Sequence, residues 1–209
     1  MAIVLLAGAT GLVGREVLRR ALGDKRITRV VAPTRRALSP RSRLENPLVD
    51  FASLNGAEPW WRVDAVICAL GTTIKKAGSQ EAFREVDHGY PLRLARHALE
   101  NGARSYALNS SVGADPVSRN FYLRTKGEVE RDLEASGYCS LTIVRPSVIG
   151  GNREEHRTGE KVAIFALSLL KPLVPRRYRV VPAERIAKAL LQAAIAGVPG
   201  KHVLESEEL

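Results

Sequence analysis

The sequence predicts a single doubly wound α/β domain, built on a mostly parallel sheet of about seven strands with helices on both faces. Three observations point to this class. Apolar, strand-like runs alternate with helical patterns from one end of the chain to the other. These runs are continuously apolar rather than alternating, which is typical of strands buried on both faces. The first run also leads directly into a glycine-bearing turn, Gly8 to Gly14, that opens a helical pattern.

The expected elements follow in order along the chain. Strands are expected at residues 3–7, 29–32, 47–50, 65–70, 105–109, 141–144 and 202–204, and helices at residues 12–22, 80–100, 120–135, 161–170 and 183–196. They consume nearly all of the chain, so residues 1–209 are expected to form one domain with 151–209 as a small extension on the substrate side. The polar segment 150–160 is expected to be a loop or a lid. The apolar helix 161–170 is expected in the core, with a lid or a homodimer contact as alternatives.

The composition excludes several classes of protein. The chain has 209 residues, of which 45% are hydrophobic and 26% charged, so it can bury a sizeable core without disulfides or metals. Its longest apolar runs fall far short of the ~18 residues needed to cross a bilayer, so no membrane span is expected. Met1 leads directly into the first strand without a basic leader, which favours a cytoplasmic protein. Cys68 and Cys139 are expected as buried free thiols, and the dispersed histidines predict no metal site.

The glycine turn after the first strand has the spacing G-x-x-G-x-x-G. Such a turn lets the backbone approach a pyrophosphate, which is then held by the N–H groups and the positive dipole end of the following helix. Glycines also serve ordinary tight turns, but the position between the first strand and the first helix favours dinucleotide binding. The residues of this turn that are expected to bind the cofactor are Gly8, Thr10, Gly11, Leu12, Val13 and Gly14.

The end of the second strand indicates which dinucleotide is bound. An acidic residue commonly stands ~20 residues after the glycines, where it binds the ribose 2′-hydroxyl. Here the count from Gly14 reaches Arg35, which is followed by Arg36. A guanidinium can bind a 2′-phosphate through two charge-assisted hydrogen bonds. We therefore expect NADP(H) to be preferred over NAD(H), with two exposed loop arginines of no special role as the alternative.

A tyrosine and a lysine lie four residues apart on the expected helix 120–135. Tyr122 and Lys126 share one helical face with Val129 and Leu133, so this face should pack inward. A lysine aimed at the core needs a partner, and an ordinary salt bridge to Glu130, one turn on, is the structural alternative. Ser111 follows the expected strand 105–109 and belongs at the carboxyl edge of the sheet, where ligands bind.

Together these residues resemble the short-chain dehydrogenase/reductase superfamily, in its atypical, extended-like branch. Within that branch the chain is most similar to the Tat-interacting-protein-like NAD(P)-binding oxidoreductases, which have a Rossmann fold. The similarity extends from the first strand to about residue 159 and is thin beyond it. The matching stretches are Val49-Asp50-Phe51, Cys68 to Thr73, Lys76-Ala77-Gly78, Ser110-Ser111-x-Gly113-Ala114-Asp115, Tyr122-Leu123-x-x-Lys126 to Glu130, and Arg145-Pro146.

The resemblance implies a role for each matching position. The three glycines would hold the pyrophosphate, and Arg35 with Arg36 the 2′-phosphate. The other implied cofactor contacts are Asp50 and Phe51 at the adenine, Leu70, Gly71 and Thr72 along the cofactor, and Pro146 and Val148 at the nicotinamide. In one departure, Asp87 stands where many extended members have an asparagine, which leaves a proton relay through this position in doubt.

The implied chemistry is hydride transfer with Ser111, Tyr122 and Lys126 as the catalytic residues. A tyrosine ordinarily has a pKa near ~10, and a neighbouring ammonium favours its phenolate. Tyr122 would donate its proton to a carbonyl oxygen as hydride arrives from NADPH, with Ser111 hydrogen-bonding the same oxygen. The expected substrate is a small carbonyl compound or its alcohol. The alternative is a sensor or interaction module that binds NAD(P)H without turnover.

The chain carries 32 Lys and Arg against 22 Asp and Glu, for a net charge of +10. That excess suits a nucleic acid, a membrane surface or a phosphorylated ligand. The basic segment 175–179 contains one tyrosine, and aromatic residues make up only 5% of the chain, so nucleic-acid bases would have little to stack on. A nucleic-acid partner is therefore not expected, and a phosphorylated cofactor accounts for part of the charge.

Overall fold

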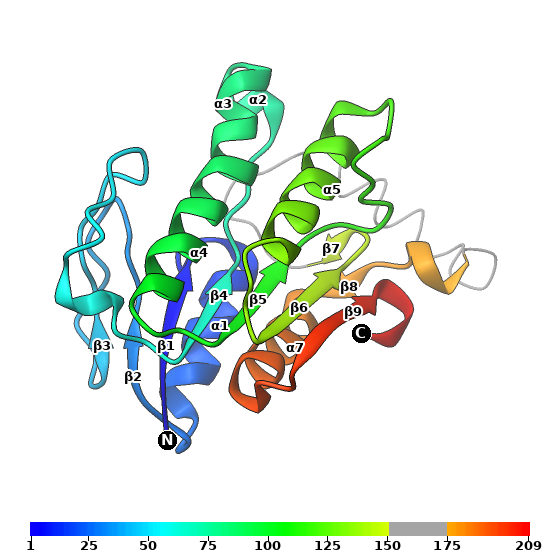
Figure 1. Ribbon diagram of the computed structural model, residues 1–209. Helices are drawn as coiled ribbons and strands as arrows, with labels where there is room; N and C mark the ends of the chain where they lie inside the picture. The colour runs from blue at the N-terminus through cyan, green and yellow to red at the C-terminus, as the bar shows by residue number, and fades with distance from the viewer. Residues whose placement is uncertain (151–174) are drawn as a thin grey trace.

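The computed structural model describes residues 1–150 and 175–209. Its centre is a seven-stranded sheet with the strand order β3-β2-β1-β4-β5-β6-β9, in which every neighbouring pair is parallel. Helices α1 (Leu12–Gly23) and α7 (Ala183–Ala196) cover one face, and α4 (Tyr90–Glu100) and α5 (Phe121–Glu134) cover the other (Figure 1). The predicted doubly wound α/β class is confirmed.

The remaining elements have the following bounds. The strands of the main sheet are β1 (Ala2–Ala7), β2 (Ile27–Val31), β3 (Leu44–Glu45), β4 (Ala65–Cys68), β5 (Ser105–Asn109), β6 (Ser140–Arg145) and β9 (Gly200–Glu205). A second, two-stranded parallel sheet joins β7 (Ile149–Gly150) and β8 (Val181–Pro182). The other helical elements are α2 (Ile74–Ala77), α3 (Gln80–Arg84), the π-helical turn η2 (Glu85–Gly89), and the 3₁₀ turns η1 (Pro59–Trp61), η3 (Arg176–Tyr178) and η4 (Ser206–Glu208).

The apolar strands are buried on both faces, as their continuous hydrophobicity indicates. In β1, Val4 and Leu6 pack with α1 and α7, whereas Leu5 and Ala7 pack with α4 and α5. All four side chains are fully buried. The sheet therefore separates two hydrophobic layers, and its carboxyl edge keeps a fixed position because helices hold both faces.

Several expected elements differ from the structure. The strand expected at 47–50 is wrong: β3 lies at Leu44–Glu45, and only an isolated bridge joins Thr34 to Leu48. Between them the side-chain amide of Asn46 donates to the Ala32 carbonyl (2.5 Å), so a side chain takes the place of a ladder bond. The single helix expected at 80–100 is divided by the π-helical turn η2. The helix expected at 161–170 lies outside the described residues, as does the loop or lid expected at 150–160 except for Gly150, which belongs to β7.

The two cysteines differ in exposure. Cys68 lies at the end of β4 and is buried as predicted, and burial raises the pKa of its thiol. Cys139 is exposed, so the expectation that both thiols are buried is wrong. It precedes β6, in the turn that follows α5, where its carbonyl accepts a hydrogen bond from the N–H of Gly200 (2.8 Å). Apolar neighbours in the sequence did not distinguish a strand residue from the turn before a strand.

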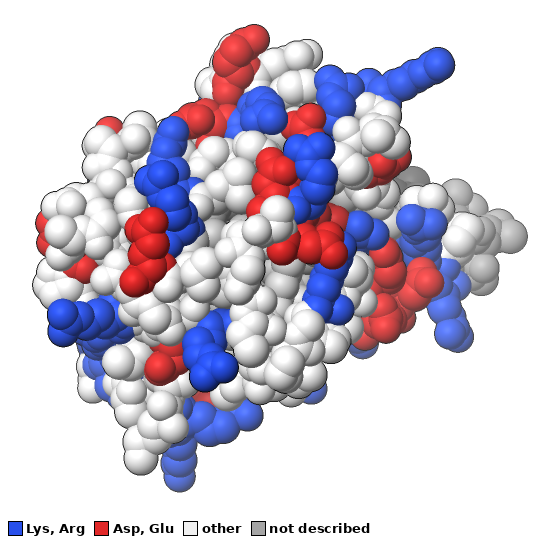
Figure 2. All heavy atoms as spheres, viewed as in Figure 1, with Lys and Arg blue, Asp and Glu red and all other residues white. Residues whose placement is uncertain are grey.

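Most of the net positive charge of the chain lies in one stretch of the sequence. Residues 15–43 contain ten Lys and Arg against two Asp and Glu, and they form α1, β2 and the loop toward β3. Within this stretch Arg43 donates to the carbonyls of Asp24 (3.1 Å) and Ile27 (2.7 Å), just beyond the end of α1. Over the face shown in Figure 2, by contrast, basic and acidic side chains are interspersed.

The described residues contain neither a candidate membrane-spanning helix nor a candidate metal-binding cluster. None of the helices at 1–150 and 175–209 is both long enough and apolar enough to span a membrane. In the same residues, no three His, Cys, Asp or Glu side chains gather where they could hold a metal ion.

Helix α5 approaches the loop after β5 at Gly127. A Cβ on Gly127 would lie 2.6 Å from the backbone nitrogen of Asp115 and closer still to its carbonyl carbon. Because the obstacle is backbone rather than a flexible side chain, the absence of a side chain at this position sets the distance between the helix and the loop that carries Ser111.

We expect Gly127→Ala to lower the free energy of unfolding by about 1–3 kcal/mol, since overpacking forces the backbone apart. The measurement is urea unfolding followed by circular dichroism. Gly23→Ala is the matched control, because Gly23 is also helical and a Cβ added there would meet nothing within 4 Å. That variant should be neutral or slightly more stable. Equal stabilities of the two variants would contradict the packing account.

Candidate active site

Four neighbouring strands end at the same edge of the sheet, and most of the predicted site residues follow them. β1 lies between β2 and β4, so the connections leave it in opposite directions, which is the switch point at which doubly wound sheets bind ligands. The glycine turn follows β1, the loop 70–72 follows β4, Ser111 follows β5, and Pro146 follows β6. The parallel topology thus brings residues distant in the sequence to one edge.

The three glycines of the turn differ in how close a side chain at each position would come to the surrounding backbone. Gly8 has a φ of +89°, and a Cβ there would lie 2.5 Å from the carbonyl oxygen of Ala69. A Cβ on Gly14 would lie 2.6 Å from the carbonyl carbon of Gly8. Gly11, in contrast, has an extended backbone (φ −77°, ψ 169°), and among the described residues only the Gly8 oxygen, at 3.3 Å, would touch its Cβ. Close backbone contacts require glycine at positions 8 and 14, whereas residues 1–150 and 175–209 leave space beside Gly11.

The start of α1 offers donors to an anion at this turn. Its first N–H groups, at Leu12, Val13 and Gly14, have no intrahelical acceptors. Gly11 is the N-cap and supplies no side-chain oxygen to them, and the first turn of the helix contains no acidic residue. The N–H groups, the helix dipole and the space beside Gly11 fit a pyrophosphate.

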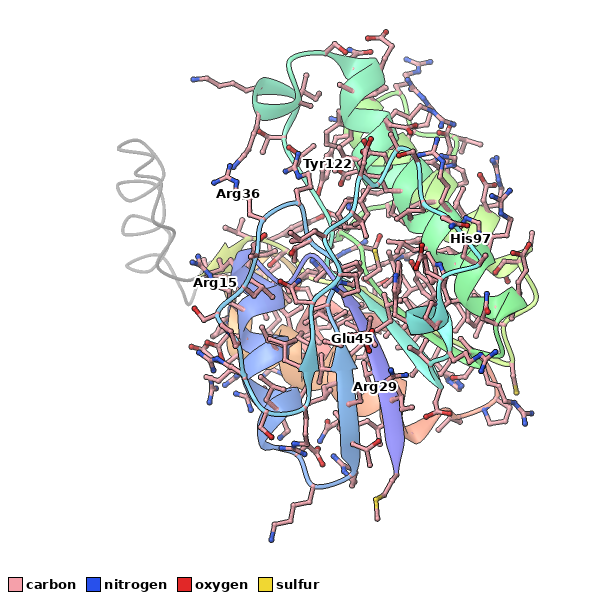
Figure 3. The ribbon with its side chains drawn as sticks, turned by 90° about the vertical axis from the view of Figure 1, so that its left-hand side faces the viewer. Arg15, Arg29, Arg36, Glu45, His97 and Tyr122 are labelled. Atoms are coloured by element: carbon pink, nitrogen blue, oxygen red, sulfur yellow. The ribbon has the colours of Figure 1, made fainter. Side chains whose placement is uncertain are left out.

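The two loop arginines lie after the end of β2, the strand that neighbours β1 in the sheet. Arg35 and Arg36 follow β2 and are exposed, and the carbonyl of Arg36 accepts a hydrogen bond from the hydroxyl of Thr34 (2.6 Å). Figure 3 shows Arg36 and Arg15 on the same flank of the molecule. Arg15 directly follows Gly14 and is exposed. The sequence analysis did not name Arg15 as a candidate for binding the cofactor. Its guanidinium, next to the third glycine of the turn, is a signal that could have suggested it.

Asp50 and Phe51 lie in the loop that follows the bridge between Thr34 and Leu48. The carboxylate of Asp50 accepts hydrogen bonds from the N–H of Ala52 (3.0 Å) and the hydroxyl of Ser53 (3.3 Å), so it caps a turn. The Phe51 ring is 5% exposed and stacks on Tyr90, with 5.7 Å between ring centroids. Both residues shape the loop beside the sheet edge.

Lys126 finds its partner on another helical element. Its ammonium lies 2.7 Å from Oδ1 of Asp87, and the side chains of the two residues are only 6% and 1% exposed. Burial opposes the charge of the lysine, but the neighbouring carboxylate of Asp87, together with Tyr122, outweighs this effect and raises the pKa of Lys126 above its usual value. Sequence reasoning identified Lys126 as an inward-facing residue that needs a partner, but it did not pair Lys126 with Asp87.

The alternative pairing of Lys126 with Glu130 does not occur. Glu130 is 4% exposed and binds Arg145, with 2.5 Å between Oε2 and Nη2, while Ser110 donates its hydroxyl to the other oxygen. Arg145 also reaches Glu205 of β9 (3.0 Å), and hydrogen bonding to Glu130 raises the pKa of its guanidinium. This cluster joins α5 to the ends of β5, β6 and β9.

Tyr122 and Ser111 are both half-buried at this edge. The Tyr122 ring packs against Phe83 of α3, with 5.8 Å between centroids, and Figure 3 shows it at the same end of the molecule as Arg36. The Ser111 hydroxyl has a long contact (3.4 Å) with the carbonyl of Val112. The tyrosine therefore lies one helical turn from a buried cation, and its ring is held by an aromatic neighbour.

The remaining predicted residues border the same edge. Leu70, Gly71 and Thr72 follow β4, and the N–H of Thr72 donates to Oδ2 of Asp87 (2.9 Å). The carbonyl of Pro146 accepts a hydrogen bond from the N–H of Val112 (2.9 Å), which joins the loops after β5 and β6. Val148 is 44% exposed.

Comparison with known proteins gives a family. A family model described as NAD(P)H-binding matches residues 8–195. "Protein fmp52, mitochondrial" of Aspergillus niger is 32% identical, over 100% of this chain and 94% of that protein. "Protein HTATIP2" of Rattus norvegicus is 33% identical, over 97% of this chain and 84% of that protein.

Solved structures share the fold. "MoeE5 in complex with UDP-glucose and NAD" superposes with a TM-score of 0.75 at 18% identity, covering 96% of this chain and 74% of that one. A "putative NAD-dependent epimerase/dehydratase from Bacillus halodurans" superposes with a TM-score of 0.70 at 18% identity, covering 100% and 98%. At such identities the likeness concerns the Rossmann fold alone.

The expected cytoplasmic location is wrong in the light of the relatives. Those from Aspergillus niger, Aspergillus fumigatus and Candida albicans carry names that say "mitochondrial". A start that leads directly into the first strand therefore did not indicate the location.

The family model spans far more than half of the chain, and the relatives exceed 30% identity over almost its whole length. The seven-stranded parallel sheet with helices on both faces agrees with that match. The chain belongs to the NAD(P)H-binding Rossmann family, as an atypical short-chain dehydrogenase/reductase of the HTATIP2 type.

Proposed function

We propose that this protein is an NADPH-dependent oxidoreductase that transfers hydride to or from a small carbonyl or alcohol substrate. Ser111, Tyr122 and Lys126 are its catalytic residues. The observation that carries the proposal is the buried, charged Lys126 one turn from Tyr122, at the sheet edge that also carries the glycine turn. A buried ammonium is costly, and beside a phenol it stabilises the phenolate that remains after proton transfer.

The glycine turn supports the cofactor assignment. The space beside Gly11, with the N–H groups at the start of α1, suits the pyrophosphate. Arg35 and Arg36 supply guanidinium groups for the 2′-phosphate, and a competing carboxylate is absent from that position in the sequence. These features favour NADPH over NADH.

Each catalytic residue has a distinct task. NADPH, when bound, supplies the hydride. Tyr122 donates its phenolic proton to the substrate oxygen as negative charge develops there. Ser111 donates its hydroxyl hydrogen bond to the same oxygen. Lys126 compensates the resulting phenolate and donates to the nicotinamide ribose. In the reverse direction the phenolate accepts the proton of the alcohol.

Removing the phenolic proton should abolish turnover. We expect Tyr122→Phe to lower kcat by about 100-fold or more, since general acid–base catalysis contributes 10²–10⁴, with the Kd for NADPH within about threefold of wild type. NADPH oxidation is measured with a panel of small aldehydes and ketones. Tyr178→Phe, at an exposed tyrosine (54%), is the control and should retain activity. Full activity of Tyr122→Phe would refute the mechanism, and a wild type that binds NADPH without any turnover would favour the sensor.

The preference for NADPH should depend on the loop arginines. Arg35→Ala and Arg36→Ala should weaken NADPH binding roughly 10–100-fold, which is the loss of a charge-assisted contact, and leave NADH binding unchanged. Titration by cofactor fluorescence measures both constants. Arg41→Ala, at an exposed arginine further along the same loop, should change neither. Equal affinity of the wild type for the two cofactors would refute the preference.

A side chain in the space beside Gly11 should lower the affinity for NADPH more than it lowers the stability of the fold. Because the Gly8 oxygen, at 3.3 Å, is the only close neighbour that the described part of the chain offers to the added Cβ, we expect Gly11→Ala to cost less than about 1 kcal/mol of stability. The same methyl group would occupy the approach to the pyrophosphate, so NADPH affinity should fall at least about tenfold. A variant with wild-type affinity would show that the cofactor does not approach this turn.

A further inference from the structure

We propose that Asp87 is the positioning residue of this site: its carboxylate keeps Lys126 charged and fastens it to the loop after β4. The lysine and the loop then act as one unit toward the cofactor. This inference rests on the proposed function, because it assigns to Asp87 the task of preparing Lys126 for the nicotinamide ribose.

The two oxygens of Asp87 serve two separate elements. Oδ1 lies 2.7 Å from the ammonium of Lys126 on α5, and Oδ2 accepts the N–H of Thr72 (2.9 Å) in the loop after β4. The loop passes directly by the carboxylate, since a Cβ on Gly71 would lie 3.5 Å from Oδ1. Asp87 is 2% exposed, so both interactions are shielded from water.

Among residues 1–150 and 175–209, Asp87 is the group that provides the counter-charge of Lys126. Besides Asp87 from η2, the groups that act on the ammonium are Tyr122 from its own helix and Cys68 from β4. The Cys68 thiol, which interacts with Tyr106 of β5, is fully buried, and burial raises its pKa, so it stays protonated at neutral pH. Glu130, one turn along α5, is bound by Arg145.

The π-helical turn η2 presents its two acidic residues differently. Asp87 points into the protein toward Lys126, whereas Glu85 pairs with Arg93, and the side chains of that pair are 41% and 35% exposed. π-turns inside helices occur frequently at functional sites. Glu85 therefore provides a matched control, because it is a carboxylate in the same turn that does not touch Lys126.

Asp87→Asn removes the charge and keeps the shape of the side chain. The ammonium of Lys126 would then be buried without a counter-charge, and desolvation would move its pKa below the value in the unfolded chain. In the wild type this pKa lies above the usual value, so the lysine stays charged throughout the neutral and mildly alkaline range.

The first arm of the experiment uses no nucleotide. The free energy of unfolding is measured by urea denaturation from about pH 7 to about pH 10. Between its lowered folded-state pKa and the ordinary ~10.4, Lys126 of Asp87→Asn binds more protons in the unfolded chain. The stability of this variant should therefore rise with pH relative to wild type. Glu85→Gln should follow the wild type, and Asp87→Asn/Lys126→Met should show no such rise.

The second arm measures NADPH affinity over the same pH range. For the wild type and Glu85→Gln, the NADPH affinity should show no change with pH that can be assigned to the titration of Lys126. Asp87→Asn should lose affinity roughly tenfold as pH rises, because the neutral amine of the lysine makes a weaker hydrogen bond to the ribose than the ammonium does. Lys126→Met should bind weakly at every pH.

The outcomes separate this inference from the proposed function. A wild type that does not bind NADPH would refute the proposed function and with it the task given to Asp87, while the first arm would still report on the ion pair. A pH-dependent stability of Asp87→Asn, combined with wild-type NADPH affinity at every pH, would reduce Asp87 to a structural role and overturn the inference. Identical behaviour of Asp87→Asn and Glu85→Gln in both arms would also overturn it.

Discussion

The arrangement of the site depends on one buried ion pair, between Asp87 and Lys126. Two charges removed from water must compensate each other, and a pair that loses one member leaves the other unpaired at a cost of about 3–5 kcal/mol. The pair spans η2 and α5, and Thr72 extends it to the loop after β4. The ion pair therefore helps to set the position of α5, and with it the position of Tyr122 at the sheet edge. Apolar packing alone does not determine that position.

Close backbone approach supplies the second constraint on the same region. The turn after β1 packs on the backbone at Ala69, and α5 packs on the backbone at Asp115, each through a glycine. Contacts of this kind allow little adjustment, since no side chain can rotate out of the way. The buried cluster of Glu130 and Arg145 then ties α5 to β6 and, through Glu205, to β9. Buried ion pairs thus hold α5 in place, and close backbone contacts hold the neighbouring loops.

Hydrophobic pattern and glycine spacing predicted much of the fold, because both are local properties. The apolar runs located six of the seven strands of the main sheet, and the glycines located the turn after β1. The position predicted for β3 was wrong, because a strand of two residues is too short to show a hydrophobic pattern. In addition, the side-chain amide of Asn46, rather than a backbone N–H, donates to the neighbouring strand. Spacing also indicated that Lys126 faces inward. It did not identify Asp87, which lies in a π-helical turn within a stretch that has the period of one continuous α-helix.

The exposed position of Cys139 has a practical consequence. The chain has two cysteines, and the other, Cys68, is buried with a raised pKa and so is slow to react. A thiol-directed fluorophore or spin label would thus attach selectively without any substitution. The label would sit before β6, at the edge of the sheet opposite the glycine turn. The natural sequence therefore offers an attachment point from which the site can be observed without being obstructed.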